Sequence, residues 1–262
     1  MKLRQPDAFG AYRVIRLLGY GMEGSTYLAV NGCGRPVAVK TSMRHKARRI
    51  LGREVAALRA ISPAFVPEVL ADDLRADPPY YVMEFIDGVC LEDYLGAAGP
   101  LSDVEVQRLG VHLAACLAAA HSAGVAHGDI RPQNWMISGG GFYLIDWGQA
   151  VLRDDSPREF RRVRRNDLRQ LGEIIVKARN GHGPYSDDSS KAIEKYTEGS
   201  LELGALSGRT REVAAMLLRR RRWWQVPPTA KRAHRVLACG RGCGRRFWAG
   251  MFATRPSWLD MG

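Results

Sequence analysis

The 262-residue sequence has no apolar stretch long enough to cross a bilayer. Its longest strongly apolar run, near residues 113–120, is flanked by His112 and His121, whereas a transmembrane helix needs about 20 apolar residues. The first residues also lack the apolar region of a secretory signal. We therefore expect a cytoplasmic protein without a transmembrane segment.

Cysteine is scarce as well. The chain has five cysteines, an odd number and mostly scattered, which argues against a disulfide framework and favours a reducing compartment. Only Cys239 and Cys243 are close in sequence, and two ligands without a suitably spaced histidine do not make a structural zinc site. A metal at this pair is the less favoured interpretation.

Acidic residues are too few to balance the basic ones, but only in the second half of the chain. Residues 1–150 hold 15 Lys and Arg against 15 Asp and Glu, and residues 151–262 hold 24 against 12. We interpret the basic half first as a solvated face. The alternatives are an anionic membrane surface, selection of acidic substrates by electrostatic steering, and nucleic acid, which is possible but not favoured.

The order of patterns predicts an α+β fold. Strand-like alternation occurs at residues 12–18, 25–30, 36–40 and 80–86, with one helical pattern at 46–60. The chain then becomes mainly helical, with helices expected at 104–123, 168–178, 189–197, 209–220 and 229–237, and short strands at 135–137 and 142–145. We expect a β-rich domain at 9–86, a mainly helical domain at 87–237, and a basic, aromatic tail at 238–262.

A glycine-rich turn joins the first two expected strands. It contains Gly19, Gly21 and Gly24, and glycines allow a backbone to approach phosphate oxygens without a Cβ in the way. The motif alone could be an ordinary turn. Because a strand rather than a helix follows, the dinucleotide-binding interpretation of the same spacing is disfavoured.

A lysine ends the third expected strand. Lys40 follows Val37-Ala38-Val39, and it could be a solvated edge lysine or could bind the α- and β-phosphates of a nucleotide, with Glu54 holding its ammonium group. The pair is suggestive only in combination with the other motifs.

Two further motifs carry carboxylates. Asp129 and Asn134 lie five residues apart on a loop after the long helix, where Asp129 can orient and deprotonate an acceptor hydroxyl while Asn134 binds magnesium. Asp146 ends a short apolar strand and is followed by Trp147-Gly148. Its carboxylate can bridge magnesium to the phosphates, although an Asp-Trp-Gly turn alone is weak evidence.

With these motifs in this order, the chain resembles eukaryotic-type Ser/Thr protein kinases over about residues 9–237. The resemblance implies a bilobal fold, ATP and Mg²⁺ as cofactors, and a protein substrate with a Ser or Thr acceptor. It implies a hinge at residues 82–85, with Met83 as gatekeeper, and it makes residues 167–172 the start of the central helix of the large lobe. The implied nucleotide contacts outside the glycine turn are Ala38, Lys40, Met83, Glu84 and Phe85.

The sequence departs from that family in its regulatory parts. Gly128 stands where regulated kinases have the arginine that receives an activation-loop phosphate, and the family's Ala-Pro-Glu has no counterpart. We therefore expect a shortened activation segment and activity that does not depend on its phosphorylation. Arg131 replaces the usual lysine and can still neutralise the γ-phosphate.

The sequence is compatible with three functions. A Ser/Thr protein kinase leads. A kinase-fold enzyme acting on a small molecule is the alternative, because the missing segment normally shapes a peptide groove. A pseudokinase scaffold is the least favoured, because Lys40, Asp129 and Asp146 are all present.

Overall fold

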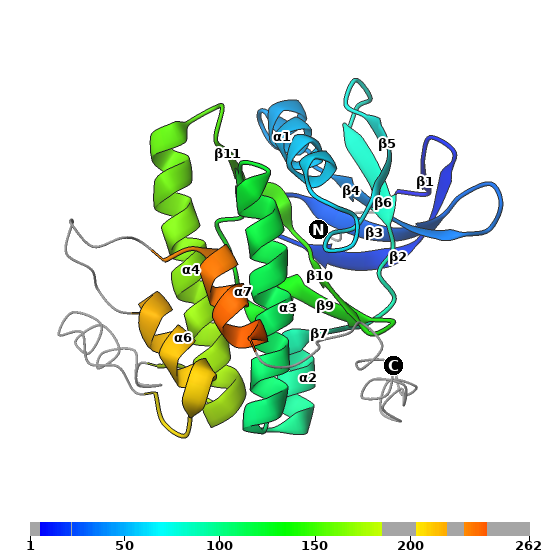
Figure 1. Cartoon of the computed structure of the whole chain (residues 1–262). Helices are drawn as coiled ribbons and strands as arrows, with labels where there is room; N and C mark the ends of the chain where they lie inside the picture. The colour runs from blue at the N-terminus through cyan, green and yellow to red at the C-terminus, as the bar shows by residue number, and fades with distance from the viewer. Residues whose placement is uncertain (1–5, 22, 185–202, 219–227, 240–262) are drawn as a thin grey trace. The chain divides into compact units, whose positions relative to one another are not determined.

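The computed structural model describes residues 6–21, 23–184, 203–218 and 228–239 (Figure 1). The chain forms two compact units. Unit 1 comprises Met1–Asp87 with Ile145–Ala150, and unit 2 comprises Gly88–Leu144 with Val151–Gly262. Residues 145–150 thus belong to unit 1, although the residues on either side of them in sequence belong to unit 2.

Unit 1 is built on a six-stranded antiparallel sheet with the order β1-β2-β3-β4-β6-β5. Its alternating β-branched and aromatic side chains suit a pleated, half-buried surface. Val14, Ala29, Val37 and Val82 belong to a buried cluster on this sheet. The strands are β1 Ala8–Phe9, β2 Tyr12–Tyr20, β3 Ser25–Val30, β4 Pro36–Thr41, β5 Val69–Asp73 and β6 Tyr80–Glu84.

The helix α1, Ala47–Ala60, completes unit 1 together with the short 3-10 helix η2, Trp147–Gln149. The buried face of α1 carries Leu51, Val55 and Leu58 at helical spacing, and Glu54 lies on the same face. The η2 segment contacts α1, and Trp147 is buried. This contact ties Asp146, which immediately precedes η2, to the helix that carries Glu54.

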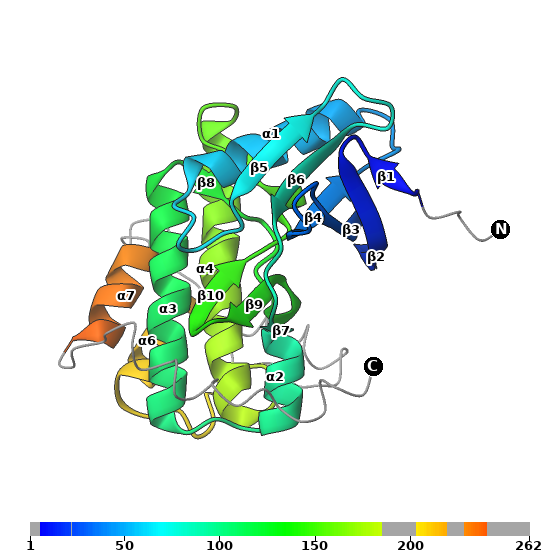
Figure 2. The same ribbon diagram turned by 90° about the vertical axis from the view of Figure 1, so that its right-hand side faces the viewer.

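Unit 2 is mainly helical, and α3 contacts α4, α6 and α7 (Figure 2). Ser102 caps α3 in a capping box with Glu105. The helices are α2 Leu91–Ala98, α3 Asp103–Ser122, α4 Pro157–Asn180, α6 Gly208–Leu218 and α7 Ala230–Ala238. None of the helices in the described ranges is both long and apolar enough to span a membrane.

Two small sheets complete unit 2. One has the order β10-β9-β7, and the other pairs β11 with β8. Their strands are β7 Val89–Cys90, β8 Val125–Ala126, β9 Trp135–Ser138, β10 Gly141–Leu144 and β11 Val151–Leu152, and the 3-10 helix η1, Pro132–Asn134, precedes β9. The loop between β8 and β9 carries Asp129 and Asn134.

The α+β fold class is confirmed, but the predicted start of one helix was wrong. Residues 167–172 do not begin the helix, because α4 starts at Pro157 and continues through Asp167. Pro157 suits the first helical turn, and Phe160 and Val163 bury their side chains three residues apart. The dense arginines of this segment masked that apolar spacing. The helix expected at 189–197 lies outside the described residues.

Candidate active site

In unit 1, Lys40 contacts two carboxylates that lie far from it in sequence. Its Nζ is 2.6 Å from Glu54 Oε1 and 2.8 Å from Asp146 Oδ1. Lys40 is 6% exposed and Glu54 is 1% exposed, whereas half of the Asp146 side chain is accessible to solvent. The structure therefore brings together three of the predicted residues and leaves one carboxylate accessible to a ligand.

Burial and charge act in opposite directions on this ion pair. Burial opposes the charge of Lys40, but Glu54 and Asp146 outweigh it, so the pKa of Lys40 is raised above its ordinary value. Burial also raises the pKa of Glu54, against the opposing effect of Lys40. The raised pKa keeps the lysine ammonium charged at neutral pH, which is the state that can hold phosphate oxygens.

Asp146 has an unusual backbone conformation. Its φ is 61° and its ψ is 68°, in the left-handed region that residues with a side chain rarely adopt. Such conformations cost free energy and cluster at functional sites. Asp146 thus combines a strained backbone, an accessible carboxylate and a contact with Lys40.

The three glycines of the turn between β2 and β3 differ in what requires them. Gly24 has φ +147°, and a Cβ there would lie 2.1 Å from the Thr41 carbonyl oxygen, so the fold itself requires glycine. A Cβ at Gly19 or Gly21 would meet nothing within 4 Å. Packing within the described residues does not explain these two glycines, which fits a need for close approach by a ligand.

This difference yields a first prediction. We expect Gly24→Ala to lower the melting temperature clearly, because the Thr41 carbonyl must move. Gly19→Ala and Gly21→Ala should melt like the wild-type protein and raise the KM for ATP. Melting followed by circular dichroism and steady-state kinetics measure the two effects. Equal loss of stability in all three variants would contradict it.

The predicted adenine-binding residues lie on neighbouring strands of unit 1. Ala38 on β4 and Met83 on β6 are cross-strand partners, and Ala38 is buried. Glu84 is the last residue of β6, and Phe85 follows it. The residues implied for the hinge thus lie at the end of a strand that pairs with the strand of Lys40.

In unit 2, the loop that carries Asp129 is held by α4. The carboxylate of Asp167 accepts hydrogen bonds from His127 N at 2.9 Å and Gly128 N at 2.8 Å, and it lies 2.9 Å from His121 Nε2. Gln170 accepts a further bond from Ile130 N at 3.0 Å. Asp167 is fully buried, so two residues one turn apart on α4 fix the backbone of this loop.

Within the loop, Asn134 is bound to Asp129. Its Nδ2 donates to Asp129 O at 2.9 Å and to Asp129 Oδ2 at 3.1 Å. This orientation makes the amide oxygen the atom suited to a cation, since Mg²⁺ prefers oxygen ligands. Arg131 is exposed, and its Nε donates to Gln133 Oε1 at 3.1 Å.

Asp167 was not predicted as a residue of the site, because residues 167–172 were expected to begin a helix. The sequence does contain a signal for this residue, because Val163, Asp167 and Leu171 follow one another at helical spacing. A carboxylate on a buried helical face needs a hydrogen-bonding partner, and here the partner is the loop.

The predicted metal ligands are Asn134 in unit 2 and Asp146 in unit 1. Over the described ranges, no group of three or more His, Cys, Asp and Glu side chains is placed to hold a metal ion. The carboxylate and amide oxygens nevertheless match the chemistry of Mg²⁺, which usually binds one or two protein oxygens together with substrate phosphates and water.

The sequence is similar to known protein kinases. The protein kinase domain family model matches residues 12–196. AfsK, a serine/threonine-protein kinase of Streptomyces griseus, is 30% identical over 205 residues, covering 69% of this chain and 25% of AfsK. PkwA of Thermomonospora curvata, a probable serine/threonine-protein kinase, is 29% identical over 233 residues, covering 79% of this chain and 31% of PkwA.

The family match covers well over half of the sequence, so this chain belongs to the protein kinase family. Protein kinases use ATP as their phosphate donor. The chain spans 25% of AfsK and 31% of PkwA. The activity and substrates of those longer proteins as a whole are therefore not transferred directly to this chain.

Proposed function

We propose that the chain is an ATP-dependent Ser/Thr protein kinase. The observation that carries the proposal is the contact of Lys40 with both Glu54 and Asp146, the latter 106 residues away in sequence. The names of the relatives, serine/threonine-protein kinases, support the acceptor type. We assign residues 9–86 to the nucleotide-binding lobe, 87–237 to the catalytic lobe, and 238–262 to a tail.

In unit 1 the proposed roles concern nucleotide binding. Lys40 binds the α- and β-phosphates, and Glu54 keeps its ammonium group in place. Gly19, Gly21 and Gly24 bring the turn backbone to the phosphates. The proposed adenine contacts are Ala38, Met83, Glu84 and Phe85. Asp146 and Asn134 are the residues that would hold Mg²⁺, which would neutralise phosphate charge.

In unit 2 the proposed roles concern the acceptor. Asp129 orients the substrate hydroxyl and accepts its proton, and Asn134 Nδ2 holds the Asp129 carboxylate in position. Arg131 neutralises the γ-phosphate during transfer, as the lysine does in related enzymes. Asp167 acts through the backbone of the loop and is a positioning residue.

We further propose that activity does not require phosphorylation of an activation segment. Support comes from α4, which begins at Pro157, eleven positions after Asp146. Ser156 is the one Ser, Thr or Tyr between Asp146 and Asp167. At position 128 the backbone has φ +92°, which favours the glycine over the arginine that would bind a loop phosphate.

We also propose a cytoplasmic location, with which the four free cysteines of the described ranges agree.

Ser156→Ala should therefore leave turnover unchanged within about twofold. Ser156 precedes α4 without a side-chain capping bond, so the substitution removes the hydroxyl with little effect on the helix. Turnover of both proteins is measured after phosphatase treatment, which removes any phosphate acquired in the expression host. A loss of activity in the variant, or in the treated wild-type protein, would contradict the proposal.

The function is tested with radiolabelled ATP and generic acidic and basic proteins as acceptors, with Asp146→Asn as the control. Label on Ser or Thr that is absent with the variant supports the proposal. ATP turnover without protein labelling favours the alternative, a kinase-fold enzyme acting on a small molecule. The short connection between β11 and α4 supports this alternative, because it leaves few residues to form a peptide groove.

A further inference from the structure

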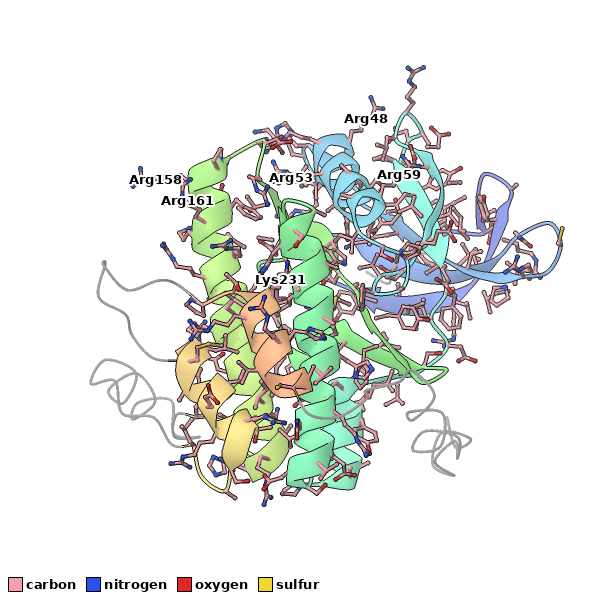
Figure 3. The ribbon with its side chains drawn as sticks, in the orientation of Figure 1. Arg48, Arg53, Arg59, Arg158, Arg161 and Lys231 are labelled. Carbon is pink, nitrogen blue, oxygen red and sulfur yellow. The ribbon has the colours of Figure 1, made fainter. Side chains whose placement is uncertain are left out.

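The first three turns of α4 carry four exposed arginines on one face. We call them the arginine stripe: Arg158, Arg161, Arg162 and Arg165. Their spacing of i, i+3, i+4 and i+7 places them on one helix face, over a length of about 10 Å. Figure 3 shows Arg158 and Arg161 pointing outward at this end of α4.

The arginine stripe has few counter-charges. Arg162 lies 3.4 Å from Glu159, and both side chains are mostly exposed, so the pair contributes little. Arg158, Arg161 and Arg165 make no hydrogen bond or ion pair with any of the described residues. Three guanidinium groups are thus available to a partner.

This arrangement is unfavourable for α4 by itself. The N-terminus of a helix carries partial positive charge and favours acidic rather than basic side chains. Like charges four residues apart, such as Arg158 with Arg162 and Arg161 with Arg165, repel each other. An anionic partner would relieve both effects, so charge complementarity favours its binding.

Two further arginines lie over the ring of Phe160 on α4. The Cζ atoms of Arg153 and Arg164 are 4.9 Å and 6.0 Å from the centre of the buried Phe160 ring. Arg164 Nε is buried without a hydrogen-bond partner in the described structure. Burial, together with the like charges of Arg153 and Arg165, lowers the pKa of Arg164. This shift reflects a crowding of cations that an anionic partner would relieve.

The helix that carries the stripe also holds the catalytic loop. Arg165 is two residues before Asp167, whose carboxylate binds the backbone of His127 and Gly128. Arginine stripe and loop therefore belong to one unit and are joined through one continuous helix. A segment bound at the stripe lies on the same helix that positions the loop of Asp129.

We propose that the arginine stripe docks an acidic segment of the protein substrate, so that the kinase prefers hydroxyls in acidic sequence. The inference rests on the proposed function and names its substrate class. Guanidinium groups bind carboxylates with two parallel hydrogen bonds. An extended peptide advances about 3.3 Å per residue, so the stripe matches about three acidic residues.

Two other anionic partners fit less well. Non-specific binding of single-stranded nucleic acid uses exposed aromatic rings for stacking, and a membrane-surface helix uses an exposed apolar face. The exposed large apolar side chains of the described residues are Ile15, Leu17, Tyr20, Met43, Leu70 and Val104, and none lies on α4. The exposed face of α4 therefore presents positive charge, but no aromatic ring that could stack on a base and no large apolar side chain that could insert into a membrane.

The test compares two peptides with the same serine, flanked either by glutamates or by glutamines. In the full chain, R158E/R161E/R165E should lower kcat/KM for the acidic peptide about tenfold, from the loss of three exposed ion pairs. It should leave kcat/KM for the neutral peptide and KM for ATP unchanged. Glutamate suits the first helical turn at position 158 and is a good helix former at the other two positions, so the variant should fold, which its melting curve checks.

The matched control reverses three exposed cations elsewhere in unit 2, K231E/R232E/R235E on α7, and should keep the preference for the acidic peptide. The inference is overturned if the wild-type protein treats both peptides alike, or if both triple variants lose the preference equally. Loss with the stripe variant alone supports it.

A binding experiment separates this inference from the proposed function. Fluorescence anisotropy with an acidic peptide in which alanine replaces the serine needs no phosphate transfer. If neither serine peptide is phosphorylated, the proposed function fails, whereas binding that the stripe variant weakens still supports docking. No binding, or tighter binding of a single-stranded oligonucleotide or of vesicles containing phosphatidylserine, would overturn the docking proposal.

Discussion

Asp146→Asn is expected to lower phosphate transfer by about 100-fold or more. The amide keeps the size of the side chain but removes the negative charge that would face Mg²⁺ and the phosphates, and losses of this order follow the removal of one electrostatic stabiliser. The effect should fall on kcat, because Lys40 retains its contact with Glu54. Steady-state kinetics with a labelled acceptor measure it.

The matched control for this substitution is Asp154→Asn. Asp154 is an exposed aspartate in the turn after β11, and it carries the same charge with no contact to Lys40. Its activity should remain within about twofold of the wild-type value. Wild-type activity in Asp146→Asn would remove Asp146 from the proposed mechanism and leave the Lys40 contact as a structural ion pair.

Asp167→Ala is expected to have the largest effect on stability. The substitution leaves the buried amide group of His127 and the partly buried amide group of Gly128 without their acceptor, and an unsatisfied buried group costs about 1–3 kcal/mol. The free energy of unfolding should fall by about 3 kcal/mol or more, and the melting temperature by about 10 °C. Thermal denaturation followed by circular dichroism measures the change.

Asp155→Ala provides the comparison, because Asp155 is exposed and precedes α4. It should melt within about 2 °C of the wild-type protein. A small shift in Asp167→Ala as well would mean that solvent or a rearranged loop satisfies the two amide groups, and that Asp167 does not position Asp129.

The sequence predicted the parts of the site that depend on local motifs. Lys40 at the end of a strand, Asp129 and Asn134 on one loop, and Asp146 before an aromatic residue were found because their spacing reflects turns and strand ends. Their contacts, such as Lys40 with Asp146, were inferred only from the order of the motifs, since a separation of 106 residues leaves no periodic signal.

The features that the sequence did not reveal depend on tertiary contacts. Asp167 was expected at the start of a helix because the apolar positions of residues 157–166 are interspersed with arginines. The strict need for glycine at Gly24, in contrast to Gly19, follows from the position of the Thr41 carbonyl on the neighbouring strand. β5 was missed because it is short and ends in two aspartates, which are uncommon in strands.

The burial of Glu54 has a consequence for how such an enzyme could be switched off. While α1 stays packed, the Glu54 carboxylate is 1% exposed and has Lys40 as its ionic partner. A rotation of α1 that separates them must either carry the carboxylate into water or protonate it, since an unpaired charge is strongly disfavoured in the interior. We therefore expect two discrete positions of α1, and an inhibitor that stabilises the outer one would act as an all-or-none switch for each molecule.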